Sequence, residues 1–264
     1  MSARNVRPTR IGSLFKENSM LLHDSRTQNL RILTAFRTMR GALFIAMSVL
    51  FAALSSHASA AERAFRLTPF STLELNLPAR YVIREAGAAS ARIRGQAEVI
   101  DRIVVEQHDD RVRIYVPGTI SIEGQLVIEI DTVGLNELVV NGAGEVQAHG
   151  FVGSEFSLRL VGAPVVRVTG LEVDKLRVEM QGSGIVDASG RVSTERLRIA
   201  GAGEYRAGDL AADSVDVELE GAGSVQVMAR ERLTVHMAGA GSVRYRGEPK
   251  LSTRIDGSGT VTRM

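Results

Sequence analysis

The stretch Leu219–Val227, LEGAGSVQV, decides the fold of this chain. A glycine, a small residue and a second glycine interrupt a pattern in which apolar and polar residues alternate. Variants of the same stretch recur at intervals of 18 to 20 residues. The first residues of these motifs are Gly142, Gly162, Gly182, Gly201, Gly221, Gly239 and Gly257. Self-similarity at this period is typical of a solenoid of stacked coils.

Both flanks of each motif alternate with period two, which predicts β-strands with one buried face. An apolar residue stands two positions before the first glycine in every repeat: Val140, Leu160, Met180, Ile199, Leu219, Met237 and Ile255. After the motif, the residues expected to point inward are Val146, Val166, Val186, Tyr205, Val225, Val243 and Val261. The sequence thus predicts an all-β, parallel β-helix-like solenoid of about seven coils, each made of a strand, a Gly-x-Gly corner, a second strand and a return loop such as SGRVSTE at 189–195.

Glycine suits such corners because it adopts positive φ and lets neighbouring coils approach closely. The predicted structural corners are Gly142, Gly144, Gly162, Gly182, Gly184, Gly201, Gly203, Gly221, Gly223, Gly239, Gly241, Gly257 and Gly259. Pro164 replaces the second glycine of one corner. Because proline fixes φ near −65°, we expect a different turn geometry there.

Three other interpretations of the glycine motifs fit less well. A dinucleotide loop needs a third glycine and a following helix, whereas a strand follows here. Calcium-binding repeats have a nine-residue period with a regular aspartate, and only Asp187 comes near that pattern. Left-handed acyltransferase helices repeat every six residues, a period that the alternating runs lack. The motifs are best interpreted as corners.

A polar column runs between the inward positions of the strand before each corner. Its members are Arg159, Glu179, Arg198, Glu218, His236 and Arg254. The first four alternate in sign, so we expect each to face opposite charges in the coils above and below. Exposed pairs of this kind contribute only about 0.2 to 1 kcal/mol each, but they favour in-register stacking.

Residues 1–60 have the features of an export leader. Gly41–Ser55 is an apolar run of signal-peptide length, and Ala58 and Ala60 occupy the small-residue positions of a cleavage site. We therefore expect the mature chain to start at Ala61 rather than to keep a membrane anchor. Because the segment before the apolar run is unusually long, Met39 is an alternative translation start.

Removal of the leader changes the charge balance. Eight of the 32 basic residues and two of the 30 acidic ones lie in residues 1–60, which leaves a net charge of about −4 for the rest. Nucleic acid is therefore not an expected partner. The chain has no cysteine, which excludes disulfides and thiolate chemistry. We expect a protein of the periplasm or cell surface of a Gram-negative bacterium, without an integral membrane span after cleavage.

The two parts of the mature chain are expected to differ. Residues 61–136 alternate as strands without a clear coil, and His108–Asp110 indicates a hairpin turn more than a metal site. We expect this segment to start and cap the solenoid, which then occupies 137–264. The last repeat should present an open strand edge through which a second molecule could pair, giving a homo-oligomer.

Catalytic candidates are few. A glycosidase needs two carboxylates flanking one bond, and the best pair is Glu204 and Glu220, beside the corners of adjacent coils. Solvated corner residues are the simpler interpretation. The histidines His108, His149 and His236 lack a nearby serine and acid, and the chain has no tryptophan to form a sugar platform.

The segments PFSTLELNLPARYVIRE (69–85), DRIVVEQHDDRVRIYV (101–116) and LVIEI (126–130), followed by GSG or GAG corners, resemble the putative auto-transporter adhesin, head GIN domain family. The likeness covers about Phe65 to Met264. It implies a right-handed β-helix-like fold of two sheets, no established catalytic residues, no cofactor, and a role in cell adhesion. We therefore expect a non-catalytic module of the cell envelope or surface that binds a glycan or an envelope protein. A polysaccharide lyase or hydrolase on the same scaffold is the alternative.

Overall fold

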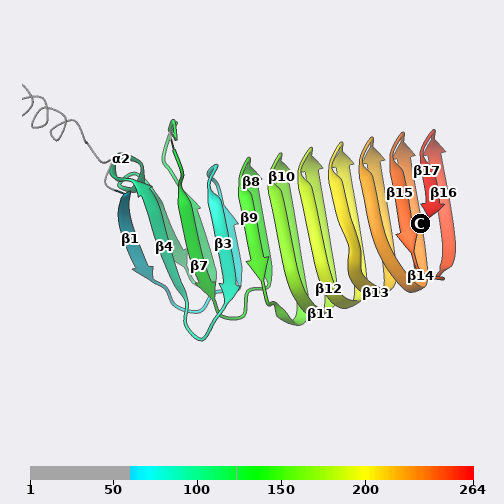
Figure 1. The fold of residues 1–264 in the computed structure, drawn as a ribbon, viewed down its shortest axis with the longest axis horizontal. Coiled ribbons are helices and arrows are strands. Elements are labelled where there is room, and N and C mark those ends of the chain that lie inside the picture. Colours follow the sequence, from blue (N-terminus) through cyan, green and yellow to red (C-terminus); the bar gives the residue numbers. More distant parts are fainter. Residues whose placement is uncertain (1–59, 123) are drawn as a thin grey trace, which may run out of the picture. The chain divides into compact units, whose positions relative to one another are not determined.

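The computed structural model describes residues 60–122 and 124–264, which are almost entirely strands (Figure 1). The predicted leader, residues 1–60, lies outside these residues except for Ala60. In chain order the elements are β1 (Ala60–Arg66), β2 (Thr72–Leu75), β3 (Arg80–Glu85), β4 (Ser90–Gln96), α2 (Ala97–Ile100), β5 (Val104–His108), β6 (Arg111–Tyr115), β7 (Val127–Thr132), β8 (Glu137–Gly142), β9 (Glu145–His149), β10 (Val152–Gly162), β11 (Val165–Gly182), β12 (Ile185–Gly201), β13 (Glu204–Gly221), β14 (Ser224–Gly239), β15 (Ser242–Arg246), β16 (Lys250–Gly257) and β17 (Thr260–Arg263). No helix within the described ranges is both long and apolar enough to cross a membrane.

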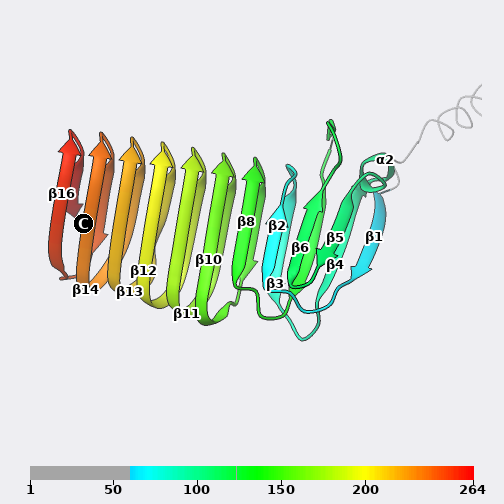
Figure 2. The same cartoon turned by 180° about the vertical axis from the view of Figure 1, so that it is seen from behind.

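The repeats form the predicted β-solenoid. Consecutive coils pair in parallel and in register, so that Gly162 lies beside Gly182 and Gly182 beside Gly201. Figures 1 and 2 show the coils stacked side by side, with the strands before and after the corners on opposite sides. The stack has about six turns, close to the seven expected from the sequence.

The predicted alternation is confirmed by burial. Up to β15 the predicted inward residues are apolar and buried, and Val217, Leu219 and Val225 have no exposed surface; in the last coil Ile255 is 37% exposed. The outward residues between them remain wholly or partly exposed. The core is therefore a layer of buried apolar side chains between the walls of the solenoid.

The return segment is not a loop, and that prediction was wrong. β12 continues through 189–195 as paired strand, with Gly190 bending the chain at φ +136°. There Gly190 lies between Leu171 and Leu210 of the neighbouring coils. Val192 is buried, so the apolar alternation continues through the bend. Because stacked coils offer a hydrogen-bonding partner on both sides, extended backbone satisfies its polar groups here better than a loop would.

The order of strands in space differs from chain order in the N-terminal part. β2 lies between β6 and β8, and β3 lies between β7 and β9. β4 pairs antiparallel with β7 and with β1, which ends this side of the stack next to α2. The predicted hairpin joins β5 to β6, and Asp109 in its turn has φ +50°.

Candidate functional site

The first glycine of each corner has positive φ, from 93° at Gly142 to 140° at Gly257. A Cβ at Gly162 would lie only 2.5 Å from the carbonyl oxygen of Gly142 in the coil below. That carbonyl accepts a hydrogen bond of 3.0 Å from the N–H of Ala163, and the same bond recurs up the stack. From Gly162 onward these glycines are thus required both by positive φ and by the close approach of the coils, whereas at Gly142 only the positive φ applies.

The second glycine of each corner is required by the close approach of the coils but not by positive φ. Gly223 does not have positive φ, contrary to the expectation that the bend would require it. A Cβ at Gly223 would instead lie 2.9 Å from the carbonyl oxygen of Gly203 and 2.9 Å from Leu219 Cδ1. Close approach of the coils is therefore what excludes a side chain here.

This distinction explains Pro164. Its corner keeps the common geometry, with Gly162 at φ +108° and the hydrogen bonds Ala163 N to Gly142 O and Val165 N to Gly144 O. The corner hydrogen bonds use the N–H groups of the middle residue and of the residue after the second glycine. Proline loses no such bond and needs no positive φ at the second position. The prediction of a different turn was wrong.

The outward column has the predicted neighbours. Arg159, Glu179, Arg198 and Glu218 lie side by side in consecutive coils. Ion pairs join Arg159 to Glu179 at 3.3 Å and Arg198 to Glu218 at 3.8 Å. His236 and Arg254 continue the column. All these side chains are partly or fully exposed, so each ion pair contributes little free energy.

Glu204 and Glu220 do not share one site. Glu204 lies after its corner and pairs with Arg206 at 2.7 Å, whereas Glu220 lies before its corner and pairs with Arg198 at 3.2 Å. Hydrogen bonding to Arg206 lowers the pKa of Glu204, which favours a permanent carboxylate over a proton donor. Each glutamate is thus held by an arginine of its own wall.

The turn residues of the β5–β6 hairpin contact different partners and do not converge on one site. His108 Nε2 lies 3.0 Å from Glu106 Oε1, and Asp110 Oδ2 accepts a 2.6 Å hydrogen bond from the Ser71 hydroxyl. Within residues 60–122 and 124–264 no three histidines or acids come together in a metal-binding group.

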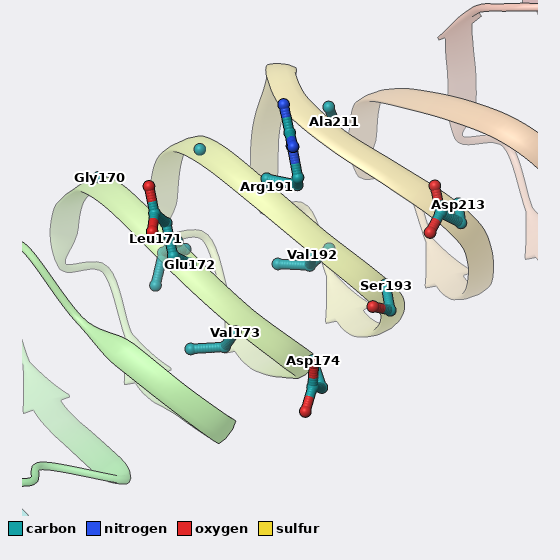
Figure 3. A pocket seen from close by; sticks show the side chains of 11 residues that line it. Gly170, Leu171, Glu172, Val173, Asp174, Arg191, Val192, Ser193, Ala211 and Asp213 are labelled. Carbon is teal, nitrogen blue, oxygen red and sulfur yellow. The ribbon is translucent and has the colours of Figure 1, made fainter.

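A recess of about 510 Å3 lies along the third face, where the strands bend between the two walls (Figure 3). Successive coils place two columns of mostly polar residues there, interrupted at Ala211. One column runs Glu172, Arg191, Ala211, and the other runs Asp174, Ser193, Asp213. Gly170 and Gly190 also line the recess.

The charges of this recess are largely uncommitted. Asp213 pairs with Arg230 at 3.7 Å. In the described part of the chain, Glu172, Asp174 and Arg191 form no ion pair. In a second recess, of about 480 Å3, Asp187 contacts both Arg167 and Arg206 at 3.2 and 3.6 Å. The first recess is therefore the better candidate for contact with an external ligand.

One buried pair was not predicted from the sequence. Glu195 occupies an inward position equivalent to Leu176 and Val215, and it faces Tyr205 from the opposite wall. Both residues have no exposed surface. Burial raises the pKa of Glu195 to about 7, against a smaller opposing effect of the Tyr205 hydroxyl. An acid in an otherwise apolar inward column was the signal that could have revealed it.

The fold defines a β-solenoid protein with flat, charged outer walls. The model of the family described as putative auto-transporter adhesin, head GIN domain, matches residues 69–249, and the chain belongs to that family. A comparison with curated proteins finds no match.

Solved structures share the fold. A putative adhesin from Bacteroides fragilis is 23% identical with a TM-score of 0.75, covering 78% of this chain and 97% of that one. A putative adhesin from Parabacteroides merdae is 17% identical with a TM-score of 0.63, covering 79% and 97%. A putative lipid binding protein from Parabacteroides distasonis is 18% identical with a TM-score of 0.65, covering 79% and 98%.

Proposed function

We propose that this protein is a non-catalytic interaction module of the cell envelope or cell surface. Membership of a family named for adhesins supports this role, and so do the adhesin names of the similar structures. The carboxylates best placed for hydrolysis, Glu204 and Glu220, lie on different walls and are neutralised by arginines. A glycoside hydrolase instead holds two carboxyl groups about 5 to 10 Å apart across one bond.

The observation that carries the proposal is the uncommitted charge of the third-face recess. Glu172 and Asp174 of one coil stand beside Arg191 and Ser193 of the next, and the three charged residues form no ion pairs among the described residues. Such groups can donate hydrogen bonds to, and accept hydrogen bonds from, the hydroxyl, amino or amide groups of a glycan or an envelope protein. Because they lie on adjacent coils and Asp213 follows on the next one, they suit an elongated ligand lying across the stack.

The test is a binding screen of the purified protein against an array of glycans and envelope polymers, with assays for sugar products on the same samples. We expect binding without turnover. Arg191→Ala should abolish or strongly weaken that binding. Arg232→Ala is the matched control, because Arg232 is also exposed but lies on the wall before the corner. Product formation would contradict the non-catalytic role, and an unaffected Arg191→Ala variant would contradict the recess as the binding site.

A further inference from the structure

We propose that the β16 end of the solenoid is a dimerisation surface for a second copy of this chain. The two copies would pair their β16 strands antiparallel about a two-fold axis at Thr253. This inference is independent of the third-face recess.

The β16 end exposes the inside of the solenoid. In β14 the inward residues Leu233, Val235 and Met237 are buried. Their neighbours in β16 are Leu251, Thr253 and Ile255. Leu251 and Ile255 are 42% and 37% exposed, and with Met264 they make up three of the six large apolar residues exposed in the described ranges. The inward apolar column thus continues into β16, where its side chains are exposed to solvent.

The two ends of the stack differ. At the other end α2 contacts β1 and β4, and it buries Val99 and Ile100. β16 pairs with β14 and β17 with β15, while the far edges of both strands carry no pairing among the described residues. A repeat array needs its terminal faces covered, and an unpaired edge is a template for strand addition.

The sequence of β16, KLSTRIDG, is complementary to itself when read antiparallel. With Thr253 opposite Thr253 of the second copy, Leu251 faces Ile255 and Lys250 faces Asp256. Each pair occurs twice by symmetry, as in an isologous interface. Arg254, which would repel an identical strand aligned on it, faces Ser252 instead. The register uses nearly the whole strand and keeps every inward residue on the inner face, because side chains alternate with period two.

Lys250 and Asp256 are available for these contacts. Lys250 forms no ion pair in the described chain, and Asp256 pairs with Arg254 at 3.3 Å while both side chains stay about 70% exposed. A carboxylate can accept hydrogen bonds from Arg254 and from a second cationic side chain at the same time. The dimer would therefore add opposite charges across the interface without breaking the existing pair.

The first test is disulfide trapping, which is unambiguous because the chain has no cysteine of its own. Residues directly opposite in antiparallel strands have Cα atoms about 4.5 to 5.5 Å apart, within the range of about 4.4 to 6.8 Å that a disulfide needs. Thr253→Cys should form a covalent dimer on mild oxidation. Ser252→Cys, one residue away and diagonal to itself, should not. Equal cross-linking of the two variants would overturn the register.

The second test measures mass in solution by light scattering or sedimentation. We expect the wild-type protein to have twice the monomer mass. Asp256→Lys should weaken the dimer by about tenfold, because lysines then face each other twice. The double variant Lys250→Asp with Asp256→Lys should restore it. Melting temperatures of all variants establish that they fold. A wild-type monomer at every concentration, or failure of the double variant to recover, would overturn the proposal.

Discussion

Glu195 and Tyr205 face each other across the interior of the solenoid, and neither has a hydrogen-bond partner in the described structure. The two side chains come from opposite walls, which the corner at Gly201 connects. The Tyr205 hydroxyl is near enough to lower the pKa of Glu195 slightly, although the two groups do not meet the geometric criteria of a hydrogen bond. Burial in such surroundings favours the neutral form of the carboxyl over the charged one.

The first prediction is a loss of stability as the pH rises. The carboxyl of Glu195 ionises near pH 4.5 in the unfolded chain but near pH 7 in the folded one. Below about pH 4.5 it is protonated in both states and contributes no loss. Between these values the unfolded chain releases its proton first, so the folded state becomes less stable until the loss is complete above about pH 7. The full loss is about 3 kcal/mol.

Glu195→Gln should remove this pH dependence, because an amide does not ionise in the range. Its melting temperature should rise relative to wild type by several degrees between pH 5 and pH 8, measured by circular dichroism. Glu218→Gln on the exposed wall is the control, and its melting temperature should change with pH in the same way as that of the wild type. A constant difference between wild type and Glu195→Gln over this range would show that the buried carboxyl is not responsible.

The second prediction concerns the corners. Gly223→Val places a β-branched side chain against the carbonyl oxygen of Gly203 and against Leu219. Overpacking of this kind costs about 1 to 3 kcal/mol, and each kcal/mol lowers the melting temperature by about 2 to 4 °C in a chain of this size.

Gly153→Ala is the matched control for Gly223→Val. Gly153 lacks positive φ, and no atom lies within 4 Å of a Cβ built there. We expect its melting temperature to stay within about 2 °C of wild type, as for most surface substitutions. Equal melting temperatures for Gly223→Val and wild type would contradict the close approach of the corners.

The third prediction concerns the outward column. A double-mutant cycle on Arg159 and Glu179 should give a coupling energy below about 1 kcal/mol, since both side chains are more than a third exposed. The coupling should largely vanish in 1 M salt, where the screening length falls to about 3 Å. A larger coupling that survives high salt would mean that the column stabilises the stack more than exposed ion pairs do.

The fourth prediction concerns export. The small residues at Ala58 and Ala60 predict cleavage before Ala61. N-terminal sequencing of the protein from the envelope fraction should therefore begin at Ala61. Ala60→Arg should block processing, whereas Ser55→Thr should not. An uncleaved N-terminus in the wild type would contradict the predicted leader.

The sequence by itself determined the solenoid, because its two strongest signals are local. The spacing of the first glycines predicted the approximate number of coils, and period-two alternation predicted that residues such as Leu219 and Val225 lie in the interior. The hairpin at His108–Asp110 was equally local. Each of these features needs only the preferences of neighbouring residues along one strand.

Only the tertiary structure decided how the coils meet. Gly223 is excluded from bearing a side chain by Gly203 of the next coil, which no local φ preference reveals. The bend at Gly190 is strand rather than loop because both neighbouring coils offer hydrogen bonds. β2 lies between β6 and β8, an order that depends on long-range pairing. Glu195 and Tyr205 meet because the corner between them folds two walls together, and contacts of this kind arise only when distant backbone segments pack.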